Sequence, residues 1–267
     1  MRIEVEHRLT LTLPPTGGQT VLHLLLTPGS GPTQSVDTWQ IEADGIETAG
    51  RFTDAFGNSV HLVNQGPAEG PVSILARGTV LTRDTSGVLG RPGHEPVPAL
   101  YRRRTELAKA PEGLAEPYRG ATLTRLEILH ELMARVGEAL GLADTPDGQA
   151  QMAVHGGQVQ RQGDNATALP PAADYAHGFI GAARSLDIPA RYVTGYLAPA
   201  HDHEGGLHAW AEAYDEGLGW IGFDPRLQIC PTDRHVRLAI GLDAQTALPL
   251  RTVPVGELVQ SVAVRSV

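Results

Sequence analysis

The chain has 267 residues and a formal net charge of −9, and this length favours about two domains. Hydrophobic residues make up 41% and charged residues 19%, which is the composition of a packed globular protein and excludes global disorder. The negative balance argues against nonspecific binding to nucleic acid or to an anionic membrane surface, since both need basic patches. We therefore expect no nucleic acid and no membrane as partner.

Cysteine content and apolar runs set the expected compartment. Cys230 is the single cysteine, which excludes an intrachain disulfide and a zinc site built from several cysteines. The charged, alternating N-terminus lacks the apolar core of a signal peptide. No run of about 18 apolar residues is present, so no membrane span is predicted. We expect a protein of the reduced cytoplasm.

The first segment, 1–82, predicts a β-rich N-terminal domain. Apolar residues alternate with polar ones along 3–13 and along 20–27, which is the pattern of half-buried strands. Many short strands joined by Gly, Pro and Asn turns favour a β-sandwich. No acids, bases or nucleophiles gather here, so we expect a support or docking domain. Further strands are predicted over 35–43, 46–52, 60–63 and 72–81.

The segment 83–120 is rich in Gly and Pro, which interrupt any long element. We interpret it as a linker or wrapping segment, compatible with one short helix over 105–109. The third segment, 121–267, opens with a clearer signal. Thr124 and Glu127 form a capping-box pattern in front of apolar residues at helical spacing. A helix is therefore predicted to begin there.

The residues that could carry chemistry lie between positions 170 and 225. A helix is predicted to start at Pro170, and strands follow over 190–197, 208–214 and 219–223. His208 opens the second strand and Asp224 ends the third, so adjacent antiparallel strands would bring an imidazole and a carboxylate together. A nucleophile would belong at the start of the helix, where the dipole lowers a thiol pKa and free N–H groups bind an oxyanion. Ala172 occupies that position and cannot attack a substrate.

Four ordered blocks strengthen this interpretation. They are Asp174-Tyr-Ala-His177, Ile188-Pro-Ala-Arg-Tyr-Val-Thr-Gly-Tyr196, His208-Ala-Trp210 and Gly219-Trp-Ile-Gly-Phe-Asp-Pro225. Together they resemble the bacterial transglutaminase-like family, within the papain-like cysteine protease and transglutaminase superfamily. The segment 235–243 is similar to the family's strand after the triad, and the β-rich half is more loosely similar to its N-terminal region. The resemblance implies an α+β fold: an N-terminal β-sandwich-like domain, then a transglutaminase-like (papain-like) domain whose nucleophile-position helix packs on an antiparallel sheet.

The same resemblance implies roles for individual positions. The nucleophilic cysteine maps to Ala172, the general base to His208 and the orienting acid to Asp224. Pro170-Pro171 stands where Gly-Val is usual in the family. This altered neighbourhood favours natural loss of the nucleophile over an engineered Cys→Ala change. Further side chains are predicted to line the cleft: Asp174, His177, Tyr196, Trp210 and Trp220.

The implied function is that of a pseudoenzyme, an inactive transglutaminase-like protein that acts as a peptide-binding, protein-binding or regulatory module. The alternative is a cysteine-dependent amidase, peptidase or transamidase whose nucleophile is replaced at Ala172. A third hypothesis is a metal-dependent hydrolase built on the loop from His201 to His208, whose spacing is not that of an established metal site. Cys230 is interpreted as a small apolar residue rather than a nucleophile. We expect no cofactor and no metal, and the sequence leaves the oligomeric state open.

Overall fold

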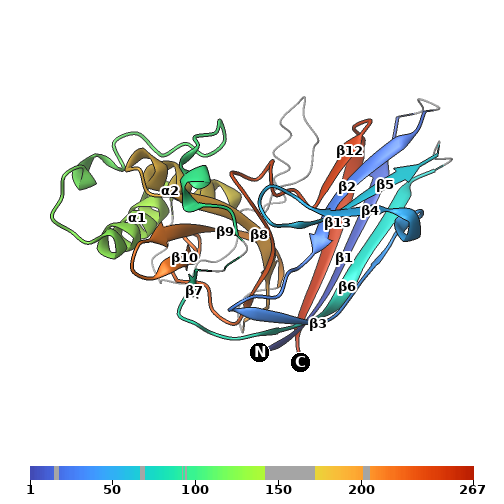
Figure 1. Cartoon of the computed structure of the whole chain (residues 1–267), viewed down its shortest axis with the longest axis horizontal. Coiled ribbons are helices and arrows are strands. Elements are labelled where there is room, and N and C mark those ends of the chain that lie inside the picture. Colours follow the sequence, from blue (N-terminus) through green and yellow to red (C-terminus); the bar gives the residue numbers. More distant parts are fainter. Residues whose placement is uncertain (15–17, 67–69, 92, 94, 142–171, 201–204) are drawn as a thin grey trace.

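The structure, a computed structural model, describes residues 1–14, 18–66, 70–91, 93, 95–141, 172–200 and 205–267. Figure 1 shows a β-rich half on the right and, on the left, a half in which two helices accompany a second group of strands. The predicted α+β class is therefore confirmed. None of the described helices is long and apolar enough to cross a membrane.

The β-rich half is a sandwich of two four-stranded sheets, with strand orders β13-β1-β6-β3 and β12-β2-β5-β4 in the described residues. The predicted alternation is confirmed, since Ile3, Leu9, Leu22 and Leu24 are all buried in the main hydrophobic cluster. The strands are β1 (Arg2–Thr12), β2 (Thr20–Thr27), β3 (Gln34–Glu42), β4 (Gly50–Thr53), β5 (Ser59–Gln65), β6 (Val72–Thr82), β12 (Leu250–Val253) and β13 (Glu257–Ser266).

The strand predicted over 46–52 is wrong in its first part. Ile46–Thr48 forms a 3-10 helix, and β4 begins only at Gly50. Gly45, with φ of 79°, occupies the left-handed region that glycine tolerates, and it turns the chain so that Ile46 is buried. A local turn has therefore replaced the first part of the expected strand.

The segment 83–120 also differs from the expectation of one short helix over 105–109. In place of a helix there, the Thr105 hydroxyl accepts a hydrogen bond from the Ala108 N–H at 3.3 Å. Short 3-10 helices lie instead at Pro98–Arg102 and Glu116–Tyr118. Each has a proline in its first turn, where the missing N–H costs nothing.

The second half is built on a five-stranded sheet with strand order β11-β8-β9-β10-β7 in the described residues. Helix α2 (Ala173–Ser185) covers one face of it, because Phe179 stacks on Phe223 and His177 stacks on Tyr192. Ala211 lies between Tyr192 and Phe223 in the register, and its small side chain allows the close approach of the helix. The strands are β7 (Val88–Gly90), β8 (Ala190–Leu197), β9 (Gly206–Asp215), β10 (Gly219–Phe223) and β11 (His235–Gly241).

Helix α1 (Arg125–Ala139) begins where the capping box predicts. The Thr124 hydroxyl accepts from the Glu127 N–H at 3.3 Å, and the Glu127 carboxylate accepts from the Thr124 N–H at 2.7 Å. These bonds satisfy backbone donors that have no partner inside the helix. Gly141, whose φ is 91°, follows the helix in the left-handed region.

Strands from the three predicted segments 1–82, 83–120 and 121–267 pair with one another in the same sheets. Strand β7, from the segment interpreted as a linker or wrapping segment, pairs with β10. Strands β12 and β13, from the third segment, pair with β2 and β1 of the first. The division into these domains remains a prediction, whereas the pairing ties both chain termini into the sandwich.

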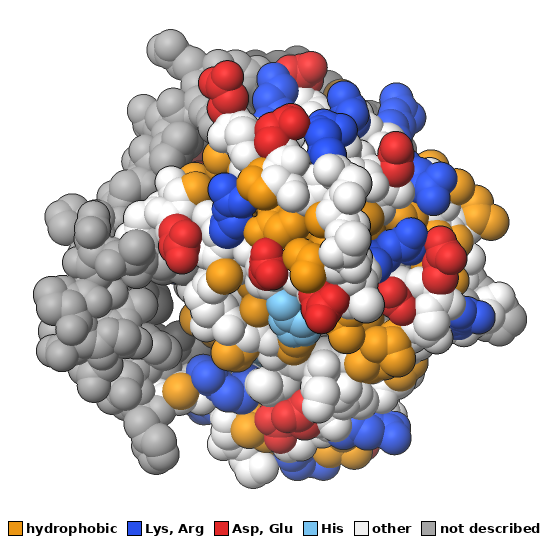
Figure 2. Space-filling view, turned by 90° about the vertical axis from the view of Figure 1, so that its left-hand side faces the viewer, with side chains coloured by type: hydrophobic (Ala, Val, Ile, Leu, Met, Phe, Trp, Pro, Cys, Tyr) orange, Lys and Arg blue, Asp and Glu red, His pale blue; other side chains and the backbone are white. Residues whose placement is uncertain are grey.

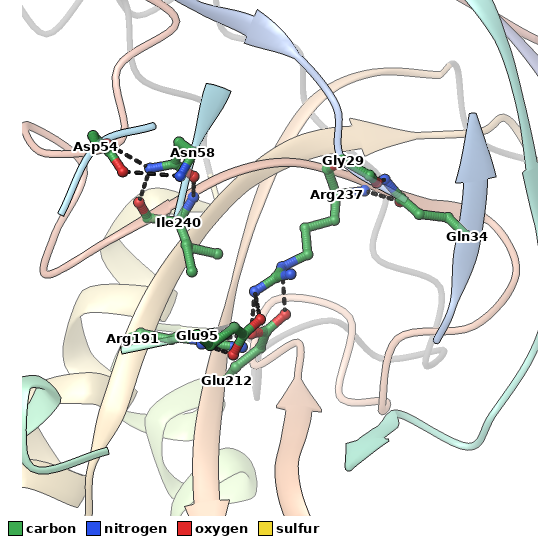
Figure 3. Close-up of polar contacts among 9 residues, drawn as sticks. All are labelled: Gly29, Gln34, Asp54, Asn58, Glu95, Arg191, Glu212, Arg237 and Ile240. Atoms are coloured by element: carbon green, nitrogen blue, oxygen red, sulfur yellow. Dashed lines mark hydrogen bonds and ion pairs between the residues drawn. The ribbon is translucent and has the colours of Figure 1, made fainter. Parts of the chain in front are cut away.

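Two side-chain amides join the sandwich to β11, an edge strand of the five-stranded sheet (Figure 3). The amide of Asn58 donates to the Ile240 carbonyl at 2.7 Å and accepts from its N–H at 2.8 Å. The amide of Gln34 makes the same pair of bonds with the backbone of Arg237, at 2.8 and 2.7 Å. Each amide therefore replaces a missing neighbouring strand and satisfies backbone groups that would otherwise be left unpaired.

Candidate active site

The centre of the candidate site is a buried carboxylate between two histidines. Asp224 directly follows β10, His208 lies near the start of β9, and His235 opens β11. The Nε2 atom of His208 lies 2.6 Å from Asp224 Oδ2, and the Nε2 atom of His235 lies 3.1 Å from the same oxygen. The contact predicted between His208 and Asp224 is present, and His235 adds a third member.

Asp224 is fully buried and its carboxylate is well supplied with donors. Its Oδ1 accepts from the N–H groups of Arg226 and Leu227 at 3.0 and 3.1 Å. Burial by itself would raise the pKa of the Asp224 carboxyl. The charge and hydrogen bonds of His208 and then of His235 outweigh burial and hold that pKa well below its usual range. The group is therefore an anion at neutral pH.

An ionised carboxylate only accepts hydrogen bonds, so it determines how His208 is protonated. The Nε2 atom of His208 must carry a proton to bond with Asp224. Neutral His208 then presents Nδ1 as its unprotonated nitrogen, and among the described residues no hydrogen bond reaches that atom. An oriented imidazole with one free nitrogen is the arrangement of a general base.

Trp210 is the one predicted cleft residue that the structure places against both imidazoles. Its ring is stacked beside His208, with centroids 6.3 Å apart, and meets His235 edge-on at 5.3 Å. Strand alternation places His208 and Trp210 on the face of the sheet opposite Ala211 and helix α2. Gly195 lies beneath the indole, and a methyl group there would stand 2.5 Å from it.

The other predicted cleft residues lie elsewhere. Asp174 is exposed in the first turn of α2. His177 is buried against Tyr192 and accepts from the Ala244 N–H at 3.1 Å. Tyr196 is fully buried against the sandwich, with its hydroxyl 3.0 Å from His7 Nδ1. Trp220 packs edge-on against Tyr101 in a separate apolar cluster.

Ala172 lies at the N-cap of α2 and is almost fully buried. Its side chain makes no capping bond, because a methyl group has no acceptor. The predicted start of this helix at Pro170, and the loop from His201 that was considered for a metal, fall outside the described residues. The predictions for these two segments therefore stay predictions.

Cys230 is half-buried and carries the chain's only thiol. Burial and then the charge of Asp84 raise the pKa of the Cys230 thiol. A thiol with a raised pKa is a poor nucleophile at neutral pH. This environment agrees with the interpretation of Cys230 as a structural residue.

A second group on the same sheet, which the sequence analysis did not predict, is a largely buried ion cluster (Figure 3). Arg191 donates to Glu212 at 2.6 Å and also to Glu95, while Arg237 reaches the same two carboxylates at 3.2 and 3.3 Å. The Arg191 guanidinium lies 3.8 Å above the Trp220 ring. Two arginines and two glutamates in alternation neutralise one another, which buried charges require. Through Glu95 the cluster holds the segment 83–120 against the sheet.

His235 was not predicted as a site residue, although it is the first residue of the segment 235–243 that resembles the family's strand after the triad. That position was a usable signal, since a histidine that opens the next strand after Asp224 can fold back toward its carboxylate. One ring nitrogen each of His208 and His235 and one Asp224 oxygen all lie within 4.8 Å of one another, a spacing that could hold a metal ion. Imidazole and carboxylate donors suit several divalent transition metals.

Figure 2 shows the face of the molecule that carries the helices. Acidic and basic side chains are interspersed there around a central group of hydrophobic side chains. Among the side chains drawn in colour, neither sign of charge dominates this face.

Comparisons with known proteins agree with this fold. A candidate cysteine protease from Cytophaga hutchinsonii has a solved structure that aligns with a TM-score of 0.68 over 99% of this chain and 90% of that chain. The two chains are 17% identical, so the likeness shows the fold alone. Within this fold, the helix and strands described above hold the His208–Asp224 pair.

Sequence relatives match over shorter segments. An uncharacterized protein of Mycobacterium leprae is 35% identical over 86 residues, 30% of this chain and 30% of that protein. A protein-glutamine gamma-glutamyltransferase of Pseudomonas aeruginosa is 37% identical over 67 residues, 22% of this chain and 10% of that protein. The chain thus matches less than a third of the length of either relative.

Two family models match separate parts of the chain. Residues 3–81 match the bacterial transglutaminase-like N-terminal region. Residues 167–225, which include α2, β8, β9, β10 and the His208–Asp224 pair, match the transglutaminase-like superfamily. The similarity to the transglutaminase-like superfamily therefore covers the segment that holds the His208–Asp224 pair.

Proposed function

We propose that this protein is a transglutaminase-like pseudoenzyme that binds a polypeptide segment at the site around His208 and Trp210. The observation that carries the proposal is Ala172, at the N-terminus of the helix whose start is where this chemistry needs a nucleophile. A methyl group cannot form the covalent acyl intermediate. The oriented His208–Asp224 pair is kept without the group that it would activate.

Cys230 does not replace the missing nucleophile in this proposal. Its thiol has a raised pKa, and its backbone follows Ile229, which forms a bridge with Asp224. Bonds from Arg226 and Leu227 also secure this turn. We therefore expect Cys230 to stabilise the turn rather than to attack a substrate.

The proposed ligand class follows from the relatives and from the aromatic wall. One relative is named as acting on protein glutamine, so we propose a polypeptide that presents a side-chain carboxamide. Trp210 stacks beside the His208 ring, and because the two residues are only 3% and 8% exposed, a ligand would meet just their accessible edges. A carboxamide N–H can donate to the free nitrogen of His208 while the rest of the side chain packs on the accessible edge of the indole.

The alternative is a cysteine-dependent amidase or transamidase silenced at one position. The 2.6 Å contact between His208 and Asp224 favours it as a second candidate, because the proton-accepting pair is in place. The two proposals make different predictions for the variant Ala172→Cys. They share the prediction that the native chain does not turn over amides.

The test measures hydrolysis of peptide esters and amides, and transfer from a glutamine peptide to an amine, by the native chain and by Ala172→Cys. We expect no turnover by the native chain. Turnover by Ala172→Cys that disappears in Ala172→Cys/His208→Ala would support a silenced enzyme. Failure of Ala172→Cys, together with glutamine-peptide binding by the native chain that Trp210→Ala weakens, would support the binding module.

The controls address the remaining thiol and the ligand. Cys230→Ala removes the natural cysteine, so any activity lost with it would contradict our assignment of that residue. Turnover by the native chain that survives Cys230→Ala would overturn both proposals. Binding of the glutamine peptide no stronger than that of a matched glutamate peptide would overturn the proposed ligand class.

A further inference from the structure

The orientation of His235 is determined by a local turn. The His235 N–H donates to the Thr232 carbonyl at 3.2 Å, which closes a turn from Thr232 to His235. The side chain then folds back over this turn, and its Nδ1 accepts from the Thr232 N–H at 3.1 Å. A ring nitrogen that accepts a hydrogen bond carries no proton, so neutral His235 carries its proton on Nε2.

This protonated Nε2 faces the Asp224 carboxylate at 3.1 Å. His235 is buried, and burial first of all lowers its pKa, an effect that its bond to Asp224 opposes only in part. The ring is therefore neutral at pH 7 and donates to Asp224 as an uncharged group. The turn thus determines which ring nitrogen of His235 carries the proton and how the ring is oriented, so His235 donates to the carboxylate through Nε2.

His208 shares the same oxygen, so the position of that oxygen sets the direction of the His208 ring. The backbone donors Arg226 and Leu227 hold Oδ1, and His235 fixes the position of Oδ2. We infer that His235 is a positioning residue that holds the Asp224 carboxylate in place and is itself oriented by the Thr232 turn. Asp224 in turn accepts a hydrogen bond from the Nε2–H group of His208, which leaves Nδ1 of His208 as the free base. The inference deepens the proposed function, since Nδ1 of His208 is the proposed acceptor for the carboxamide of the ligand, and in the silenced-enzyme alternative it is the base that Ala172→Cys tests.

The same turn bears on a metal ion at this cluster. A metal bound to Nε2 of neutral His235 would move the ring proton to Nδ1, where it would meet the Thr232 N–H. Two N–H groups would then point at each other in a buried place, which costs free energy. The turn thus favours the hydrogen-bonded arrangement over metal coordination.

The first experiment reads the proton positions in the native, ¹⁵N-labelled chain by long-range ¹H–¹⁵N correlation NMR at pH 7. We expect both His208 and His235 to carry a proton at Nε2, Nδ1 of His235 to carry none, and Zn²⁺ to leave these signals unchanged. Protonation of His235 at Nδ1, or equimolar Zn²⁺ shifting both histidines, would overturn the inference. This measurement needs no enzymatic activity, so it stands even if Ala172→Cys fails to turn over.

The second experiment separates positioning from stability. His235→Phe keeps the ring volume and removes the donor, while His235→Gln keeps an N–H donor at a similar reach. Both are placed in Ala172→Cys and compared as folded protein. We expect His235→Phe to lower kcat by about 10- to 100-fold with KM nearly unchanged, because a misplaced base costs that much, and His235→Gln to recover most of the loss. Equal kcat in the parent and in His235→Phe would contradict the positioning role.

Discussion

At the scale of single residues, two positions, Gly195 and Ala172, matter because their side chains are small. Gly195 pairs with His208 across β8 and β9, and it leaves room for the Trp210 ring. Ala172 places a methyl group at the start of α2. Gly195 allows the aromatic contact beside His208, whereas Ala172 leaves the start of α2 without a reactive side-chain atom.

Gly195→Ala tests this packing. The added methyl group would lie 2.5 Å from one atom of the Trp210 ring and 2.6 Å from another, with the Val236 carbonyl also too close. We expect a loss of unfolding free energy of about 1–3 kcal/mol from overpacking, and weaker binding of the glutamine peptide as Trp210 moves. Gly206→Ala in β9 is the matched control, because a methyl group there meets nothing within 4 Å. Equal stability of the two variants in urea unfolding would refute the argument.

At the scale of elements, edge strand β11 lies where the two halves meet. Its inner edge pairs with β8, and its backbone is also capped by the amides of Asn58 and Gln34. His235 and Arg237 lie on this strand, so the same element serves the Asp224 site and the ion cluster. Displacing β11 would therefore disturb both sites together.

Asn58→Asp tests this role. The Asn58 amide donates to Ile240 at 2.7 Å and to the Asp54 carboxylate at 2.9 Å, and a carboxylate at position 58 can do neither. We expect a stability loss on the order of 3 kcal/mol, from an unsatisfied carbonyl and a second anion beside Asp54. Asn64→Asp, on the exposed side of β5, is the control. Thermal unfolding of both variants at pH 7 measures the difference, and a difference within error would contradict the role assigned to Asn58.

At the scale of the whole molecule, one cluster of buried apolar residues runs from the sandwich to helices α1 and α2. Polar groups beside this cluster pair across the two halves. His7, on β1, accepts from the Tyr196 hydroxyl through Nδ1 at 3.0 Å, and its Nε2 lies 3.1 Å from the Gln260 side chain. The phenol stays neutral because burial raises the pKa of Tyr196. The sandwich and the five-stranded sheet therefore share a buried, uncharged contact.

This contact predicts a pH dependence of stability. Burial lowers the pKa of His7 from 6.5 to about 4. Below pH 6.5 His7 is protonated in the unfolded chain but stays neutral in the folded chain. The contribution of His7 to the free energy of unfolding is therefore complete above pH 6.5 and decreases as the pH falls to about 4. The loss attributable to His7 is about 3 kcal/mol. Urea unfolding between pH 7 and 4 measures it, and His7→Gln should flatten the curve.

Other histidines act in the same direction, so the comparison with a variant isolates the share of His7. Burial also lowers the pKa values of His23, His61 and His235. His130→Gln, at an exposed position of α1, is the control for replacing a histidine by glutamine. An unchanged slope in His7→Gln would show that His7 does not couple folding to pH.

Local chemistry was readable from the sequence. The capping box at Thr124, the alternation along β1 and β2, and the limits of β8 and β10 depend on neighbours within one element, so the chain order reveals them. The ordered blocks around His208 and Asp224 predicted the fold class and the contact between these two residues. The 3-10 helix at Ile46–Thr48 was harder to predict, because burial of Ile46 favoured it over strand propensity.

Tertiary structure alone decided which distant residues meet. His235 reaches Asp224 only because β11 pairs with β8, and β13 pairs with β1 from the opposite end of the chain. Tyr196 and Trp220, predicted for the cleft, turn to His7 and to Tyr101 because strand alternation and the contacting layer select their faces. Sequence determines the kinds of residues and their local periodicity. The pairing of strands and the packing of layers determine which side chains share a buried space, because that choice depends on many long-range contacts at once.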